Sequence, residues 1–362
     1  MSTSRAIDRR GYGPLPPGVF VAPFPDPHAS DQEAEVSRAL RGSPHVRPET
    51  RQRILQIARQ LNYRVDRNAA RLRTGRGGTL ALLLFEDPTG DDSQINPFFL
   101  SMLGSVTRAA ASYSYAVLVS FQQLSDFWDA SYEASNRADG IILLGYGDYL
   151  TYGEKLDALQ EMGSHFIIWG PPAARQLGHS LSSDNFDGAV QAVRHLVRLG
   201  RRRIAFLGGA GPDCPEFEQR HLGYCSVLRE AGLTPDPTLH VEAINQEGSG
   251  SRATQRLLSE GGTFDAIFAA SDLIAIGAMR TLHDARVDVP REVSVVGFDD
   301  LPAASYVYPG LTTVRQDTAL AGKLLVDKLI KIIEGEHVES AKIPLQLVVR
   351  ESCGAKAADH AP

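Results

Sequence analysis

Short apolar runs alternate with longer amphipathic stretches from Thr79 onward, and this alternation limits the possible folds more than any other feature of the chain. The runs are rich in Val, Ile and Leu, as in strands buried on both faces of a parallel sheet. The stretches between them repeat their apolar residues with helical spacing. The predicted strands are residues 79–85, 116–120, 140–144, 165–169, 203–208, 266–270 and 293–298. The predicted helices are residues 98–112, 149–161, 186–199, 220–231, 251–260, 272–285 and 318–334.

Seven strands spread over about 230 residues suit an α/β protein with two doubly wound parallel-sheet lobes better than one large sheet. A last strand is expected within residues 343–352. We expect the first lobe to comprise about residues 79–178 plus 318–336. The second lobe should then comprise about residues 179–317 plus 337–352, followed by a short tail at 353–362.

Composition and cysteine usage narrow the class of protein. With 43% apolar and 22% charged residues, the chain has the composition of a globular protein. Its longest unbroken apolar run, at residues 80–85, is far shorter than a membrane span, and no signal peptide is evident. Three cysteines without a CxxC pair indicate neither a disulfide framework nor a zinc site. We therefore expect a cytoplasmic protein with no metal, no cofactor and no membrane partner.

A strongly basic arm precedes the α/β region. Residues 37–76 contain eleven arginines against only Glu49 and Asp66, so this arm carries about +9 while the whole chain carries −6. A compact cationic arm on an acidic body is typical of a nucleic-acid-binding protein, whereas an ordinary solvated face usually mixes both signs. A helix is expected from Pro48 onward, because apolar residues recur at positions 54, 57, 58 and 61.

The basic arm also carries a specific order of sequence motifs. Residues 36–55 read VSRALRGSPHVRPETRQRIL, residues 62–64 read NYR and residues 68–76 read NAARLRTGR. These motifs resemble the DNA-binding head and hinge of lactose-repressor (LacI/GalR) family transcription regulators. The resemblance implies a small all-α helix-turn-helix head at residues 36–65, followed by a hinge helix and linker at residues 66–78.

The same resemblance assigns DNA contacts. Ser37 and Arg38 would close the recognition helix, where an arginine can bond to a guanine edge. The hinge residues that match DNA-contacting positions of the family are Asn68, Ala69, Arg71, Leu72 and Arg73. Leu72 matches the leucine that enters the minor groove and kinks the duplex. The alternative for Leu72 is an ordinary core leucine.

Residues 1–35 depart from the family pattern. Six prolines between positions 14 and 27 exclude the regular first helix of such a head. Glu33 and Ala34 occupy the expected base-reading positions, and Glu35 replaces a phosphate-contacting threonine. Two explanations are open: an altered or frameshifted N-terminus on an ordinary repressor, or a regulator whose head has decayed. The abrupt return to the family pattern at Val36 favours the first.

The region after Thr79 resembles the effector domain of the same family, and hence periplasmic sugar-binding proteins. The motifs that carry this resemblance are NPFF (96–99), ADGIILLG (138–145), SSDNFDGAVQAVRHLVRLGRRRIAFLGG (182–209), RHLGY (220–224), AASDLIAIGAM (269–279), PREVSVVGFDD (290–300) and LTTVRQD (311–317). By position, the resemblance implies that four residues bind an effector in the cleft between the lobes: Asp184, Arg220, Asp299 and Gln316. Further candidates are Ser271, Asp272, Phe98 and Phe99; asparagine is common in the family where this chain has Ser271.

The chemistry of these candidates suits a sugar or a related small polyol. Carboxylates accept hydrogen bonds from pairs of hydroxyl groups, an arginine donates to oxygens, and Phe98 with Phe99 would supply an apolar wall. Simpler roles are also open. Asp184 and Asp272 are suitable N-cap residues, and Arg220 would form a surface pair with Glu218.

The resemblance therefore implies a ligand-responsive, DNA-binding transcriptional regulator, a repressor that senses a sugar. It would be a homodimer, with a tetramer left open, and it would bind a pseudopalindromic operator. In the family, helices corresponding to residues 98–112 and 272–285 pair the subunits. One alternative is a carbohydrate-binding protein that has lost DNA binding. The other is an enzyme, for which the sequence offers no HExxH, Walker or GxSxG motif.

Overall fold

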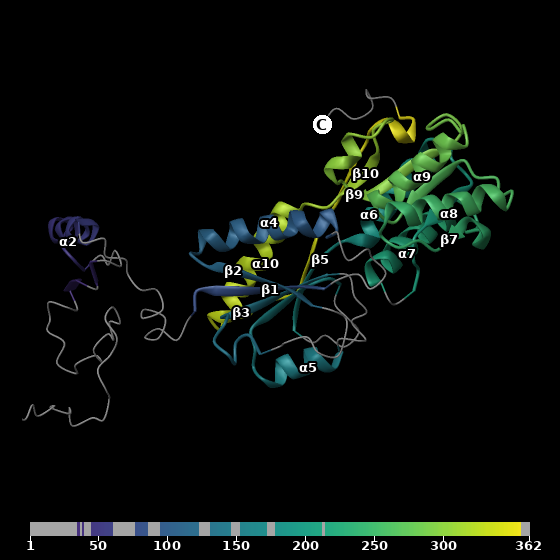
Figure 1. Ribbon diagram of the computed structural model, residues 1–362. Helices are drawn as coiled ribbons and strands as arrows, with labels where there is room; N and C mark the ends of the chain where they lie inside the picture. Colours follow the sequence, from purple (N-terminus) through teal and green to yellow (C-terminus); the bar gives the residue numbers. More distant parts are fainter. Residues whose placement is uncertain are drawn as a thin grey trace, which may run out of the picture. The chain divides into compact units, whose positions relative to one another are not determined.

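The computed structural model describes residues 35–36, 38–39, 45–60, 77–85, 95–122, 131–145, 153–171, 178–211 and 214–355. The chain divides into two compact units, residues 1–75 and 76–362. In the first unit, helix α2 (Pro48–Gln60) begins at the predicted proline (Figure 1). The Arg51 N–H donates to the Arg47 carbonyl at 3.0 Å, which confirms the predicted helix start. Ala39 and Val46 are buried in this unit.

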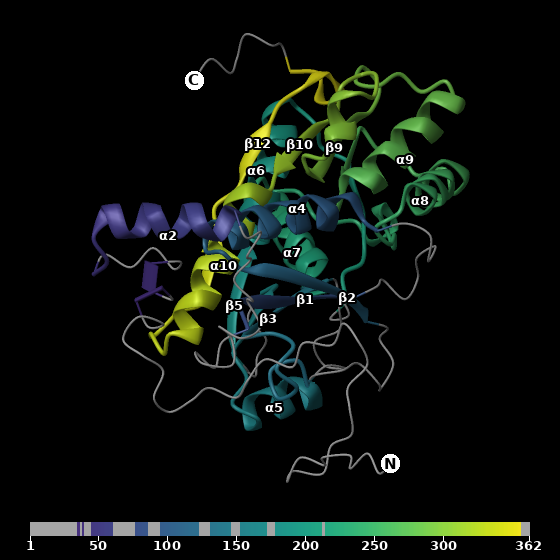
Figure 2. The ribbon, with the colours of Figure 1, turned by 60° about the vertical axis from the view of Figure 1, so that its left-hand side comes forward.

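The second unit contains two sheets, and in its described residues the first sheet has the strand order β11-β5-β4-β3-β1-β2. All of its neighbouring strands are parallel. Its strands are β1 (Thr79–Phe85), β2 (Ala116–Gln122), β3 (Gly140–Gly145), β4 (Phe166–Trp169), β5 (His179–Ser183) and β11 (Ala341–Ile343). Helices α4 (Pro97–Ser112) and α10 (Thr318–Ile333) pack together on one face, although they are far apart in the sequence (Figure 2). Helix α5 (Gly153–Glu161) covers the other face.

The second sheet has the order β12-β10-β9-β8-β6-β7 within the described residues, and only its edge strand β12 runs antiparallel. Its strands are β6 (Ile204–Leu207), β7 (His240–Val241), β8 (Ala266–Ala269), β9 (Ser294–Asp299), β10 (Thr312–Arg315) and β12 (Gln346–Val348). Its helices are α6 (Asn185–Arg198), α7 (Pro215–Glu230), α8 (Glu247–Ser259) and α9 (Asp272–Asp284). Three short 3₁₀ turns, η1 (Pro237–Leu239), η2 (Pro302–Ser305) and η3 (Glu351–Cys353), complete the described part of this lobe.

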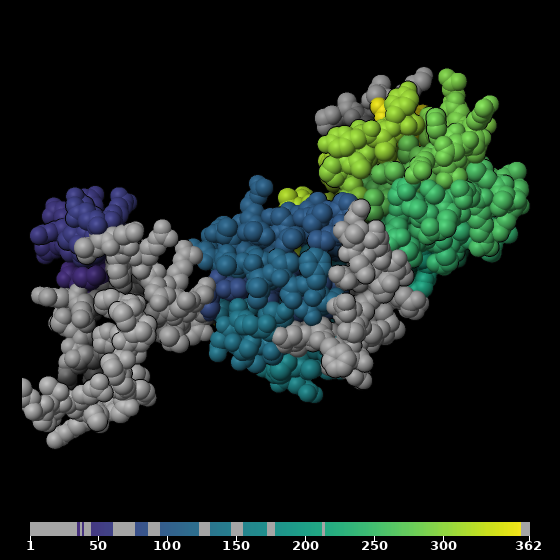
Figure 3. Space-filling view, viewed as in Figure 1, coloured from purple at the N-terminus to yellow at the C-terminus, as the bar shows by residue number. Residues whose placement is uncertain are grey.

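Close helix pairing shapes the second lobe. Helix α6 packs against α7, and α8 packs against α9. Gly277 of α9 lies so close to the Glu247 carbonyl of α8 that a Cβ atom would overlap it. In Figure 3 the first lobe of the second unit is mostly blue and the second lobe is mostly green. The predicted α/β fold with two doubly wound parallel sheets is therefore confirmed.

The described chain passes between the lobes three times. The first crossing (residues 183–185) joins β5 to α6, the second crossing (residues 315–318) joins β10 to α10, and the third crossing (residues 343–346) joins β11 to β12. These crossings place polar side chains at the carboxyl ends of strands from both sheets. In open α/β sheets, ligands bind at that edge.

The sheet pairing corrects the predicted lobe boundaries. Strands β5 and β11 pair in the first sheet, so residues 179–183 and 341–343 belong to the first lobe rather than the second. The serines of β5 hide it from a search for apolar runs, yet residues 180–183 are buried. The last strand expected within residues 343–352 is confirmed as β12 (Gln346–Val348), which joins the second sheet, while residue 343 ends β11 of the first sheet.

Other boundaries differ by a few residues. Helix α7 begins at Pro215 rather than at residue 220, and α8 begins at Glu247 rather than at residue 251. The polar first turns of both helices conceal their starts from apolar periodicity. Cys353 is buried, so the folded domain extends beyond the predicted end at residue 352. Among the described helices, none has the length and apolar character of a membrane span.

Candidate effector site

A cavity lies between the lobes, beside the first and second crossings. Its walls come from α4, from the ends of β4 and β5, from the first turn of α6, from the first two turns of α7, and from the second crossing. Its lining residues in the described chain are Phe98, Trp169, Gly170, Ser182, Ser183, Asn185, Glu216, Arg220 and Gln316. The cavity thus combines two aromatic rings with converging polar groups, a composition typical of small-molecule sites.

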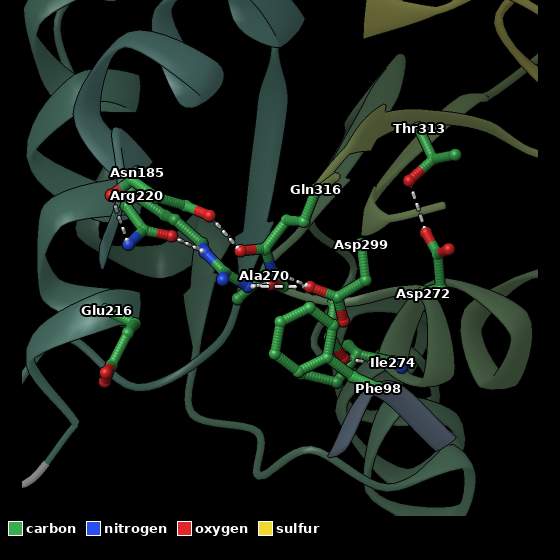
Figure 4. Close-up of polar contacts among 12 residues, drawn as sticks. Phe98, Asn185, Glu216, Arg220, Ala270, Asp272, Ile274, Asp299, Thr313 and Gln316 are labelled. Atoms are coloured by element: carbon green, nitrogen blue, oxygen red, sulfur yellow. Dashed lines mark hydrogen bonds and ion pairs between the residues drawn. The ribbon is translucent and has the colours of Figure 1, made fainter. Parts of the chain in front are cut away.

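Arg220 of α7 is the central cation of this site. Its side chain is 1% exposed, and its guanidinium carbon lies 3.7 Å from the ring centroid of Phe298. Nε donates to Asn185 Oδ1 at 2.9 Å, and Nη1 donates to the Ala270 carbonyl (Figure 4). Nη1 also lies 3.6 Å from Asp299 Oδ1. The alternative of a surface pair with Glu218 is therefore wrong, because the guanidinium is enclosed and bonded inside the domain.

Asp299 ends β9 and faces this arginine from the sheet. Its Oδ1 accepts a hydrogen bond from Gln316 Nε2 at 2.7 Å, while its buried Oδ2 has no hydrogen-bond partner in the described residues. Burial raises the pKa of Asp299 to about 6, although the Arg220 charge and the Gln316 hydrogen bond act in the opposite direction. Its backbone has φ of +120°, a conformation that non-glycine residues rarely adopt. Strain of this kind concentrates at functional sites.

Gln316 connects the acidic side of the site to the first lobe. Its Oε1 accepts a hydrogen bond from Ser183 Oγ at 2.5 Å, and its Nε2 bonds to Asp299. Asn185, which bonds to Arg220, follows two residues after Ser183, and its Nδ2 donates to the Ser183 carbonyl at 3.2 Å. A closed set of polar contacts therefore links the first crossing, the second crossing and the end of β9.

Glu216 is a site residue that the sequence prediction missed. It lies one helical turn before Arg220 on α7, so both side chains lie on the same face of the helix. The side chain is 5% exposed and lines the cavity, and Oε1 has no hydrogen-bond partner in the described chain. Burial raises the pKa of Glu216 to about 7, against the opposing charge of Arg220. Its spacing of four residues from Arg220 was the available sequence signal.

The aromatic wall differs from the predicted one. Phe98 lines the cavity, and its ring centroid lies 6.1 Å from that of Trp169, which also lines it. Phe99 packs edge-to-face on Phe98 at 5.4 Å, but it belongs to the core of the first lobe and not to the lining. Trp169, and not Phe99, is therefore the second aromatic residue that lines the cavity.

Three predicted site residues have structural contacts instead. Asp184 is the N-cap of α6 and accepts from the Asp187 N–H at 3.2 Å, so its capping alternative is confirmed. Ser271 is the N-cap of α9, a role that had been considered for Asp272. Asp272 is fully buried one residue later, where its carboxylate accepts from the Leu301 N–H and the Thr313 hydroxyl. These three residues are not among those that line the cavity.

Burial also perturbs the titration of Asp272. Burial raises its pKa well above the ordinary value, and the nearby charge of Asp299 acts in the same direction. The charge of ionised Asp299 therefore disfavours ionisation of Asp272. Since Asp272 ties the loop after β9 to β10, it holds the strained backbone that presents Asp299.

Most of the predicted DNA contacts fall outside the described residues. Arg38 is helical and exposed, and its contact with DNA stays a prediction. Ser37, Asn68, Ala69, Arg71, Leu72 and Arg73 lie outside the described residues. Within the part of the chain that the structure describes, His, Cys, Asp and Glu side chains form no cluster able to hold a metal ion.

Comparison with known proteins also separates a DNA-binding head from an effector domain. Residues 34–66 match the model of bacterial regulatory proteins of the lacI family, and residues 193–353 match a periplasmic binding protein-like domain. The HTH-type transcriptional regulator CelR of Thermobifida fusca is 32% identical, over 88% of this chain and 93% of its own length. The chain belongs to the LacI family. The family match begins at residue 34, close to Val36, where the expected sequence pattern resumes.

Other relatives agree. The ribose operon repressor of Halalkalibacterium halodurans is 30% identical over 90% of this chain and 94% of its own. The solved structure of the transcriptional regulator CelR–cellobiose complex has a TM-score of 0.68 at 29% identity, covering 87% of this chain and 94% of its own. The lac repressor dimer bound to operator has a TM-score of 0.74 at 24% identity, which shows a common fold. These relatives are transcription regulators, and this LacI-family chain is a helix-turn-helix transcriptional regulator.

Proposed function

We propose that this LacI-family regulator is a repressor that senses a sugar or a related small polyol in the cavity between its lobes. The observation that carries the proposal is the buried set of contacts among Arg220, Asp299, Gln316, Asn185 and Ser183 beside the cavity. Carboxylate, guanidinium and amide groups that converge beside an aromatic wall suit a ligand with several hydroxyls. A relative is named for its complex with cellobiose, which supports a sugar as the effector.

In this proposal, Arg220, Gln316 and Asn185 bond to the effector, and Asp299 holds Arg220 and Gln316 in place. Asn185 replaces Asp184 as the contact at the start of α6, because Asn185 lines the cavity and Asp184 caps the helix. Phe98 and Trp169 provide apolar contact for the ligand. Asp272 and Ser271 have no direct contact with the ligand and instead support the loop geometry.

The effector would act on DNA binding through the crossings. Ser183 and Asn185 lie at the first crossing, and Gln316 lies at the second. A ligand that bonds to these residues would have different contacts in each of two arrangements of the lobes. It would therefore bind one arrangement more tightly, and this difference in binding free energy shifts the equilibrium between the two arrangements. The basic head with Arg38 and the hinge residues 68–73 would then bind a pseudopalindromic operator in the cytoplasm.

The regulator is proposed to act as a homodimer, since two heads are needed for two half-sites. Apolar side chains on the edge strand β2 support a contact there: Leu118 and Val119 are 38% exposed and Phe121 is 48% exposed. Leu100 of α4 is also exposed. Helix α9 is covered by α8, which leaves it less surface for pairing than the sequence suggested. Sedimentation equilibrium of the full chain gives its mass in solution. A dimer or tetramer would support this proposal, and a monomer would contradict it.

The proposed function is tested by fluorescence anisotropy of the full chain on its own promoter DNA and on a scrambled duplex. A salt series, with and without a panel of neutral sugars, gives both affinity and specificity. We expect tighter binding to the promoter, a steep fall of affinity with salt, and release by one of the sugars. Weak and equal binding to both duplexes would instead favour a sugar-binding protein without a working head, the alternative raised by residues 1–35.

A further inference from the structure

Two polar atoms of the cavity wall have no partner in the described residues. Glu216 Oε1 and Ser182 Oγ are buried without a hydrogen bond, and both residues line the cavity. The other carboxyl oxygen of Glu216 lies 3.9 Å from Cys214 Sγ. Figure 4 shows Glu216 apart from the bonded group around Arg220. A buried polar atom without a hydrogen-bond partner is unfavourable. A ligand that bonds to these two atoms would remove that cost, and its binding would therefore be favoured.

The charges around the cavity disfavour an anion. Arg220 is the sole cationic side chain among the lining residues that the structure describes, and it already faces Asp299 at 3.6 Å. Its Nε and Nη1 groups donate to Asn185 and to the Ala270 carbonyl. Glu216 adds a second carboxyl group near the same cation. An anionic ligand would therefore meet one engaged guanidinium and two carboxyl groups, and like charges in a buried site repel strongly.

The protonation state of Glu216 makes this selection depend on pH, because only the ionised carboxylate repels an anion. Burial raises its pKa to about 7, so protonated and ionised forms are both populated near neutral pH. The protonated carboxyl can donate and accept hydrogen bonds, and the ionised carboxylate accepts them. A hydroxyl group can bond to either form, whereas an anionic ligand is compatible with the protonated form alone.

We propose that Glu216 is a specificity-determining residue of the effector site. It bonds to a hydroxyl group of an uncharged sugar, and it excludes sugars that carry a carboxylate or a phosphate. This inference rests on the proposed function and narrows the class of effector. Glu216 contacts the ligand directly, while Asp299 restrains the guanidinium beside it.

Isothermal titration calorimetry of the full chain at pH 8 tests the inference. The probes are glucose, galactose and cellobiose, each beside the derivative that carries a carboxylate at C6, together with glucose 6-phosphate. We expect at least one neutral sugar to bind, and its charged derivatives to bind at least about tenfold more weakly. In Glu216→Gln, which keeps the shape and removes the charge, we expect that ratio to fall by about tenfold or more.

Two further variants separate charge from shape. Glu218→Gln removes a carboxylate from the same part of α7 but outside the lining, so the ratio should stay as in the wild type. Glu216→Asp keeps the charge and shortens its reach, so it should retain the exclusion of anions while weakening the binding of the neutral sugar. An unchanged ratio in Glu216→Gln would overturn the inference and leave the proposed function standing. Failure of every sugar to bind the wild-type chain would overturn both.

Discussion

Ser183 Oγ donates a hydrogen bond to Gln316 Oε1 at 2.5 Å, and this bond joins two of the three crossings between the lobes in the described chain. Gln316 in turn bonds to Asp299, which faces Arg220. Two residues proposed to bind the effector, Asn185 and Gln316, therefore also lie at the crossings. A ligand that replaces or strengthens any of these contacts acts directly on segments that connect the two lobes.

Removal of the central cation should abolish the response to the effector. Arg220→Ala leaves Asp299 and Asn185 buried without their partner, so we expect the free energy of unfolding to fall by about 3 kcal/mol. The sugar that raises the melting temperature of the wild-type chain should give no shift in this variant. Arg256→Ala is the matched control, because its pair with Glu260 is exposed and worth less than about 1 kcal/mol. A normal ligand-induced shift in Arg220→Ala would exclude Arg220 from the site.

A buried residue beside the site should affect stability without affecting affinity. In the wild type, the two carboxyl oxygens of Asp272 accept hydrogen bonds from the Leu301 N–H and the Thr313 hydroxyl. The amide of Asp272→Asn has only one acceptor oxygen, so one of these two donors loses its bond. We expect the free energy of unfolding to decrease by about 1–2 kcal/mol in urea denaturation. Because Asp272 does not line the cavity, the calorimetric affinity for the sugar should remain within about threefold of the wild type. A much larger loss of affinity would return Asp272 to the effector site.

The raised pKa of Glu216 predicts a pH-dependent stability. Its pKa in the folded protein is about 7, above the ordinary value of 4.5, so the folded state holds this proton more tightly than the unfolded state does. This stabilisation is fully present below about pH 4.5 and is lost as the pH rises through about 7. The loss amounts to at most about 3 kcal/mol.

The measurement is urea denaturation of the full chain at pH 5.5 and at pH 8. The wild type should lose more stability between these values than Glu216→Gln, which has no proton to release. Glu218→Gln should behave as the wild type, and Asp299 contributes equally to all three proteins. Equal losses in the wild type and Glu216→Gln would mean that the Glu216 carboxyl is not buried as the structure describes.

The hinge prediction concerns Leu72, which lies outside the described residues and depends on the family resemblance. Leu72→Ala should weaken binding to the operator by tenfold or more, on the order of 1–3 kcal/mol, because only the kinked complex inserts this side chain. Binding to a scrambled duplex should change little, since it depends on phosphate contacts. Anisotropy titrations on both duplexes at one salt concentration measure this difference, and an equal loss on both would contradict the wedge role.

Local sequence patterns predicted most of the secondary structure of the effector domain. Helix α9 was expected at residues 272–285 and is observed at Asp272–Asp284, because its apolar residues repeat with helical spacing. Strand β5 was missed, because its serines are buried by neighbouring strands and not by their own apolarity. Glu216 was missed for a related reason: its carboxyl is buried by packing between α7 and the rest of the lobe.

The sequence by itself determined the α/β alternation, the basic arm, the family, and the presence of Arg220, Asp299 and Gln316 near the cleft. The alternation and the basic arm follow from periodicity and charge, which are properties of residues close together in the chain. The three site residues are implied by the family resemblance that the motifs carry. Only the tertiary structure decided that β5 and β11 join the first sheet, that Asn185 and Trp169 line the cavity, and that Glu216 Oε1 has no hydrogen-bond partner among the described residues. Sheet membership and the satisfaction of buried polar atoms depend on contacts between residues far apart in the chain, and local sequence patterns do not specify them.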